Sequence, residues 1–188
     1  MKKGLLILVA LIAILLVCFG YVVSVRNSFV RMQEDVNAKF AQVENQLKRR
    51  ADLIPNLTNT VKGYAKHEKE IFEKLAEARS RMMGARSPQE LFSASNELNT
   101  ALSRLLVVVE NYPNLKADAT FTRLMDELAG TENRISVERM RYNESVKAYN
   151  LKIKVFPANI IANMFGFSPL PYYEIPAKDK ETPVVDFK

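Results

Sequence analysis

Cysteine, histidine, tryptophan and glycine are scarce in this chain of 188 residues, which has one cysteine, one histidine, no tryptophan and six glycines. A lone cysteine excludes a disulfide framework within the chain, and one cysteine with one histidine cannot form a zinc finger or a Cys/His metal cluster. So few glycines argue against a glycine-rich nucleotide-binding fold. The formal net charge is only +6 and no basic arm is present, so we expect no nucleic-acid partner.

Residue combinations typical of catalytic centres are also missing. His67 is the single imidazole, and although Glu68 follows it, no second histidine completes a zinc-peptidase motif. A di-iron bundle needs Glu-x-x-His pairs, and the sequence contains none. Cys18 lies within the most apolar part of the chain. The sequence therefore predicts a protein that is not an enzyme and that uses no cofactor or metal.

The most distinctive segment is an uncharged run of 21 residues, 5–25, that follows Lys2 and Lys3. As a helix it would be about 31 Å long, close to the thickness of a bilayer's hydrocarbon core. The apolar part of a secretory signal is shorter, about 7–15 residues, and ends at a small-residue cleavage site that is not seen here. The run predicts an uncleaved signal anchor in the lipid bilayer, with a cleaved signal peptide as the alternative.

Charges on the two flanks of this run bear on its orientation. Lys2, Lys3 and the terminal amine precede it, whereas Arg26 and Arg31 follow it. The positive-inside rule then places the N-terminus in the cytoplasm. We therefore expect a single-pass cell-membrane protein with its remaining residues outside the cytoplasm.

Beyond the anchor, the pattern is helical. Apolar residues recur at alternating spacings of three and four from Phe29 onward, as in helices that pack against one another in a bundle or coiled coil. Ser87, Pro88 and Glu90 match a capping box with proline at the first helical position, so a helix should begin there. It should end at Pro113, and the last long helix should start near residue 121.

Pro55 leaves two readings of the first packed segment. The apolar pattern continues through Pro55, which favours one bent helix over about 27–83. Such a rod would be roughly 85 Å long, more than the later helices could cover. A break near Leu53, with Asp52 as the cap, instead gives four segments of similar length. We favour the break, and hence an all-α fold in which the transmembrane helix precedes an antiparallel up-and-down four-helix bundle.

The end of the chain should contain a short apolar helix over 158–165, closed by Gly166, and an extended tail with four prolines. The expected organisation is an N-terminal flank at 1–4, the anchor at 5–25, the bundle at 26–167 and the tail at 168–188.

Polar residues at or beside the packing stripes form the candidate site. They are expected either to make a paired polar layer that sets helix register or to line a partner or ligand groove. These residues are Arg50, Asp52, Asn56, Glu68, Glu132, Asn133, Arg134, Glu138, Asn143 and Asn150.

Several of these residues lie in runs that resemble the signature of the LemA family. The first run is Arg-Arg-Ala-Asp-Leu-Ile-Pro-Asn-Leu at 49–57. The others are at 61–65, 67–68, 112–117, 121, 124, 128, 130–135, 139, 142–143, 149–150, 156–157 and 165–167. The resemblance covers nearly the whole chain. It implies a bacterial single-pass membrane protein with an antiparallel helical bundle and no established enzymatic activity. Relatives include a protein needed for shaping magnetosome membranes, and family genes often lie near that of a membrane zinc peptidase.

Two functions follow as hypotheses. The first is a membrane-anchored scaffold that self-associates as a homo-oligomer or binds membrane proteins, and so organises or remodels the bilayer. The second is an adaptor or sensor domain for a membrane partner such as a zinc peptidase. An apolar patch supports the first hypothesis, unless it only caps the bundle: Ile160, Ile161, Met164, Phe165 and Phe167.

Overall fold

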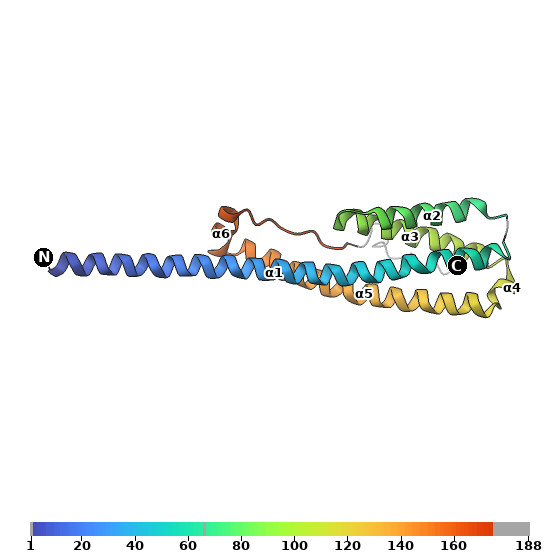
Figure 1. Cartoon of the computed structure of the whole chain (residues 1–188), viewed down its shortest axis with the longest axis horizontal. Coiled ribbons are helices and arrows are strands. Elements are labelled where there is room, and N and C mark those ends of the chain that lie inside the picture. The colour runs from blue at the N-terminus through green and yellow to red at the C-terminus, as the bar shows by residue number, and fades with distance from the viewer. Residues whose placement is uncertain (1, 66, 175–188) are drawn as a thin grey trace, which may run out of the picture. The chain divides into compact units, whose positions relative to one another are not determined.

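The protein is described by a computed structural model, which covers residues 2–65 and 67–174 (Figure 1). Regular structure in these residues is entirely helical, so the predicted all-α class is confirmed. The helices are α1 (Lys2–Lys62), α2 (Lys69–Gly84), α3 (Pro88–Val109), α4 (Pro113–Lys116), α5 (Ala119–Lys154) and α6 (Ala158–Phe165).

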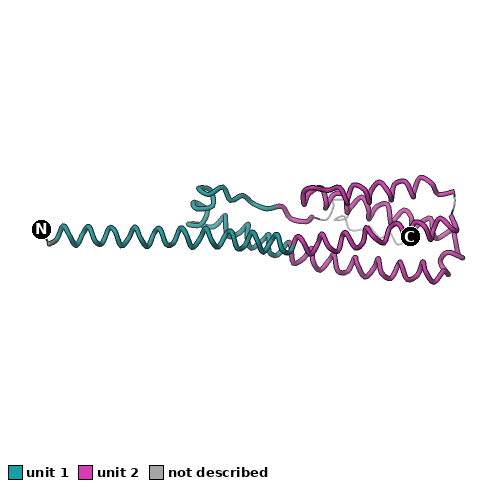
Figure 2. The backbone as a smooth tube through the Cα atoms, in the orientation of Figure 1, with its two compact units in different colours: residues 1–39, 143–170 teal, residues 40–142, 171–188 magenta. Residues whose placement is uncertain are grey.

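The chain forms two compact units (Figure 2). Unit 1 comprises residues 1–39 and 143–170, and unit 2 comprises residues 40–142 and 171–188. Of the predicted tail at 168–188, residues 175–188 lie outside the described residues.

Besides the short α4, unit 2 contains four long helical segments that run alternately up and down: the second part of α1, then α2, α3 and the first part of α5 (Figure 1). Short connections join them, which places successive segments antiparallel. Aliphatic side chains from all four segments have 5% exposure or less and form the core; they include Val43, Leu47, Ile54, Leu57, Leu75, Leu98, Leu105, Leu128 and Ile135.

The predicted break near Leu53 is wrong, and so is the alternative of one helix over 27–83. Helix α1 continues through Pro55 to Lys62, and the chain turns only between there and α2. A proline inside a helix leaves the carbonyl four residues earlier without its N–H donor. Here that carbonyl belongs to Ala51, and the Nε–H of Arg79 on α2 donates to it at 2.9 Å. A side chain from the neighbouring helix thus replaces the lost backbone bond.

Local caps define where two of the helices start. The hydroxyl oxygen of Ser87 accepts a bond from the N–H of Glu90 at 3.2 Å, so the predicted cap of α3 is confirmed. Helix α5 begins slightly before the predicted position because Asp118 caps it. One carboxylate oxygen of Asp118 accepts bonds from the backbone N–H groups of Thr120 and Phe121 at 2.8 and 2.9 Å.

Unit 1 consists of the first part of α1, the second part of α5, and α6 with the residues that follow it (Figure 2). The packed part of α1 starts at Val25, which is 7% exposed, and includes Phe29, which is fully buried. Gly166 ends α6 with a left-handed φ of 75° that favours glycine, and the next residue, Phe167, packs on Phe29 with ring centroids 5.1 Å apart. Before Val25, α1 is long and apolar enough to cross a membrane, with mean hydropathy 3.1 over an 18-residue window whose residues are not buried.

Candidate functional site

The ten candidate polar residues do not meet in one layer. Asn143 and Asn150 belong to unit 1, and the others to unit 2. Their burial differs as well: two are buried (Arg50 and Asn150), four are half-buried (Glu68, Glu132, Glu138 and Asn143) and four are exposed (Asp52, Asn56, Asn133 and Arg134).

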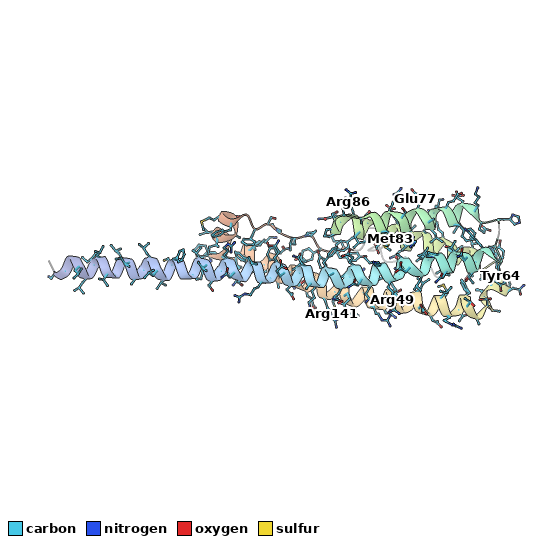
Figure 3. All side chains as sticks on the ribbon, viewed as in Figure 1. Arg49, Tyr64, Glu77, Met83, Arg86 and Arg141 are labelled. Atoms are coloured by element: carbon cyan, nitrogen blue, oxygen red, sulfur yellow. The ribbon has the colours of Figure 1, made fainter. Side chains whose placement is uncertain are left out.

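The most buried charge in unit 2 is that of Arg50 on α1. Its guanidinium pairs with the carboxylate of Glu132 on α5, and the side chains are 10% and 46% exposed respectively. Burial lowers the pKa of Arg50 from its usual value, and the negative charge of Glu132 opposes that shift. Arginine nevertheless stays charged in proteins. The pair therefore links α1 to α5. Arg49, the residue before Arg50, is exposed (Figure 3).

Tyr173, which follows the last helix, is 4% exposed and interacts electrostatically with Arg50. Its hydroxyl bonds the hydroxyl of Ser95 at 3.1 Å, and its ring stacks on Phe92 with centroids 3.9 Å apart. The guanidinium of Arg139 lies 5.6 Å from the centre of the same ring. Burial raises the pKa of Tyr173, so its hydroxyl remains protonated at neutral pH. We call residues 171–174 the strap, because this segment is fastened to the bundle although it is not helical.

Backbone groups at the strap and just before it are held by side chains. In unit 2, the hydroxyl of Tyr142 donates to the carbonyl of Pro171 at 2.9 Å. In unit 1, the amide of Asn150 donates to the carbonyl of Leu170 and accepts from its N–H, both at 2.8 Å. An amide side chain can match both backbone groups of one residue in this way. Asn150 was among the predicted polar residues, but its partner Leu170 was not, because residues 168–188 were predicted only as an extended tail.

A second polar cluster ties the loops at one end of unit 2. The hydroxyl of Tyr64, labelled in Figure 3, donates to Asp118 at 2.9 Å, and the hydroxyl of Tyr112 donates to Glu68 at 3.2 Å. Backbone bonding from Phe121, followed by the bond from Tyr64, lowers the pKa of Asp118. Asp118 was not among the predicted residues, although an aspartate three residues before an apolar helical pattern is a recognisable cap.

The other candidates make local contacts or face solvent. Asp52 lies 3.9 Å from Arg79, and Glu138 pairs with Arg141 at 2.7 Å within α5. Arg134 is exposed, so the large destabilisation expected for a stranded buried charge does not apply to it.

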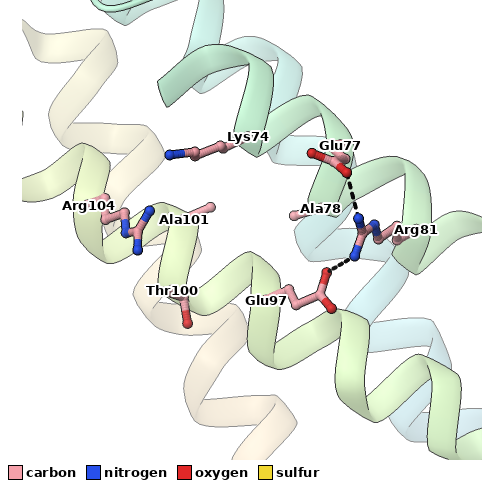
Figure 4. A pocket seen from close by; sticks show the side chains of 8 residues that line it. All are labelled: Lys74, Glu77, Ala78, Arg81, Glu97, Thr100, Ala101 and Arg104. Carbon is pink, nitrogen blue, oxygen red and sulfur yellow. Dashed lines mark hydrogen bonds and ion pairs between the residues drawn. The ribbon is translucent and has the colours of Figure 1, made fainter. Parts of the chain in front are cut away.

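A small hollow between α2 and α3 is lined by charged residues (Figure 4). Its volume is about 230 Å³. Arg81 bridges Glu77 at 2.6 Å and Glu97 at 3.1 Å across this hollow. Ligand pockets are usually roughly 300–1,000 Å³ and mostly apolar. We interpret the hollow as a surface ion-pair network between helices. Within residues 2–65 and 67–174, no three His, Cys, Asp or Glu side chains gather in a way that could hold a metal ion.

The predicted apolar patch is divided between the core and the surface. Ile161 is 4% exposed and packs inside unit 1, together with Ala158 and Ala162. Three other members remain uncovered: Ile160, Met164 and Phe165 are 57%, 63% and 45% exposed. Phe156, just before α6, is 79% exposed and extends this surface. We call these four exposed residues (156, 160, 164 and 165) the α6 face.

Comparison with known proteins finds the same family that the sequence motifs resemble. The family model of the LemA family matches residues 39–187. Magnetosome proteins MamQ 1 and MamQ 2 of Paramagnetospirillum magneticum are each 30% identical to the chain over 186 residues, covering 85% of it and 68% of their own length. Protein LemA of Metamycoplasma hominis is 26% identical over 141 residues, covering 73% of the chain and 63% of its own length.

Proposed function

Because the chain belongs to the LemA family and its first helix carries an apolar run, we propose that it is a single-pass membrane protein whose bundle acts as a non-enzymatic scaffold. The observation that carries the proposal is the continuity of α1. One helix contains both the exposed apolar run and the packed residues from Val25 onward, without a flexible joint between them. The span would thus hold the packed residues of unit 1 that follow it close to the bilayer surface.

Exposure supports a lipid environment for the first part of α1. Large apolar side chains there, such as Leu8, Ile12 and Leu16, are 54%, 49% and 66% exposed. Water would disfavour such a surface, whereas hydrocarbon would cover it. The relatives named as magnetosome proteins are consistent with a role in organising or remodelling a membrane. A cytoplasmic N-terminus is part of the same proposal. Lys3 lies on that flank of the apolar run, and Arg26 and Arg31 lie on the other flank.

The proposed scaffold acts through self-association or through membrane partners. Phe29 and Val36, on the part of α1 that follows the apolar run, are 0% and 3% exposed and belong to the core of unit 1. A contact between copies must therefore use other surfaces, and confinement in a bilayer raises the effective concentration that favours weak contacts.

Amine crosslinking of the full chain in native membranes tests this proposal. We expect a ladder that begins with a homodimer, and detergent dilution should remove it because it removes the confinement. A chain that stays monomeric in membranes at native abundance, and crosslinks to no other protein, would refute the scaffold. Protease added to intact spheroplasts tests the orientation separately: the bundle should be digested, and full protection would place it in the cytoplasm.

The second candidate function is an adaptor or sensor for a membrane partner such as a zinc peptidase. The strap favours it, because Tyr142 and Ser95 hold an extended segment much as a peptide-binding surface would. Mass spectrometry of the crosslinked species separates the two functions. Recovery of a peptidase with little self-crosslinking would favour the adaptor, and recovery mainly of the chain itself would favour the scaffold.

A further inference from the structure

Most of the α6 face is exposed, although the other side of α6 is well packed in unit 1. Ala158, Ile161 and Ala162 form its buried side, with 4%, 4% and 1% exposure. A helix that lies on a bundle in water normally presents polar residues on its opposite side. In α6 the exposed side carries Ile160, Met164 and Phe165, with Asn163 as its one exposed polar residue, so this side is mostly apolar.

The position of α6 along α1 indicates what covers this face. The ring of Phe165 lies 5.5 Å from the guanidinium carbon of Arg26, and Phe167 packs on Phe29. Arg26 directly follows the apolar run, and Phe29 lies about 6 Å beyond the end of that run at the rise of an α-helix. The headgroup layer on each side of a bilayer is about 5–8 Å thick. If the run spans the hydrocarbon, α6 contacts α1 at headgroup depth.

Two further observations fit this depth. In Figure 1, α6 turns across the direction of α1 instead of continuing along it, as a helix in the plane of the membrane would. Lys152 and Lys154, in the last turn of α5 just before α6, are both exposed. Together with Arg26 they supply the cations that interfacial helices direct toward anionic phosphates.

We infer that the α6 face is a second membrane contact, in which Phe156, Ile160, Met164 and Phe165 enter the headgroup and upper acyl layer of the leaflet beside the span. This inference rests on the proposed membrane anchor. Its occupant is the lipid surface, because the face contacts α1 at Arg26, directly after the apolar run, and is bordered by basic residues. Apolar side chains inserted into one leaflet displace lipid there alone, so the contact gives the scaffold a wedge that responds to membrane curvature.

Lipid-borne quenching tests the contact on the full chain. The native Cys18, exposed within the apolar run, is labelled with an environment-sensitive fluorophore to report on the anchor. In a Cys18→Ser background, Met164→Cys reports on the α6 face, and Met140→Cys is the matched control. Met140 is 54% exposed, against 63% for Met164, and it lies on α5 about 21 Å before the end of that helix at Lys154. Each chain is labelled in detergent, checked by circular dichroism and reconstituted in phosphatidylcholine–phosphatidylglycerol vesicles with doxyl-labelled lipid.

We expect strong loss of fluorescence at positions 18 and 164 and little loss at position 140. Quenching at position 18 but not at 164 overturns this inference and leaves the anchor standing, whereas no quenching at position 18 refutes the anchor and the inference with it. Equal quenching at 164 and 140 also overturns it, because the contact would not belong to this face. A label at 164 that neither lipid quencher nor aqueous iodide reaches would show a protein partner in place of lipid, and would likewise overturn it.

Discussion

The compensation of Pro55 by Arg79 makes a quantitative prediction about stability. Proline in a helix interior typically costs about 3 kcal/mol or more, partly because one backbone bond is lost. Here the Nε–H of Arg79 occupies the freed carbonyl of Ala51 at 2.9 Å. If this bond substitutes for the missing one, Arg79 should matter only while residue 55 is proline.

The magnitude follows from the bond and its exposure. Hydrogen bonds to charged groups contribute about 1.5–3 kcal/mol. The Arg79 side chain is 35% exposed, so water competes for the carbonyl and the lower part of that range applies. Arg79→Met keeps the apolar stem and removes the donor, and we expect a loss of about 1–2 kcal/mol in the free energy of unfolding. In a Pro55→Ala background, the new N–H can bond Ala51, and the same substitution should cost less than about 0.5 kcal/mol.

A double-mutant cycle measures this coupling. Urea unfolding of the full chain in detergent, followed by circular dichroism at 222 nm and by the near-ultraviolet tyrosine signal, gives the four free energies. Arg86→Met, at an exposed position of the connection between α2 and α3, is the control and should change stability little in either background. Equal losses from Arg79→Met with proline and with alanine at position 55 would refute the compensation.

Three further predictions concern the polar contacts. The pKa of Asp118 is lowered in the folded chain, so its ionised form adds stability above the unfolded pKa of about 3.9, and that stability disappears as the pH falls through the folded pKa. Asp118→Asn keeps a capping side chain, so its deficit in melting temperature against wild type should shrink on acidification; a deficit independent of pH would contradict this assignment. Tyr173→Phe removes the hydroxyl that bonds Ser95 and should cost about 1 kcal/mol. Tyr173→Ala also removes the ring that stacks on Phe92 and should cost about 3–5 kcal/mol; similar losses by urea unfolding would mean that the ring contributes little. Arg134→Ala should stay within about 0.5 kcal/mol because Arg134 is exposed, and a multi-kilocalorie loss would show that it is paired after all.

The helices were predictable because each has a periodic apolar face, but one chain reversal was not. The predicted stripe runs through Val61, Tyr64, Glu68 and Ile71 without losing its spacing, as if the helix continued. In the structure, Tyr64 and Glu68 lie in the turn, where their side chains bond Asp118 and Tyr112. These contacts involve residues more than 40 positions apart, so the periodicity of one segment contains no sign of them.

At Pro55 the sequence pattern is also insufficient, but here a predicted helix end is absent from the structure. Proline is a strong local signal for a helix end and favours a break near Leu53, although the apolar pattern continues through it. What overrides it is the donor from Arg79, which reaches the site only after α2 has folded back along α1. Tertiary contacts of this kind decide whether a local preference is obeyed, and a single sequence does not reveal them.

Part of the candidate site was accessible for a different reason. Arg50 was recognisable as a charge on an apolar stripe, and a buried charge needs a partner. The partner, Glu132, was in the candidate set but could not be assigned from sequence, since nothing local sets which residue of α5 faces Arg50. The strap was not predicted, because an extended segment has no helical period, although Tyr173 is buried and aromatic.

The short helix α6 shows what the sequence pattern predicts and what depends on the residues packed around the helix. Its composition predicted a short, strongly apolar helix, and both a bundle cap and an interaction surface were consistent with that. The structure assigns one half to each: Ile161 packs inside unit 1, while Ile160 and Met164, on the other side of the same helix, remain uncovered. A helix whose buried side is apolar and whose exposed side is mostly apolar needs two apolar environments. The protein core supplies the first, and the position of α6 against Arg26, directly after the apolar run, points to the bilayer as the second.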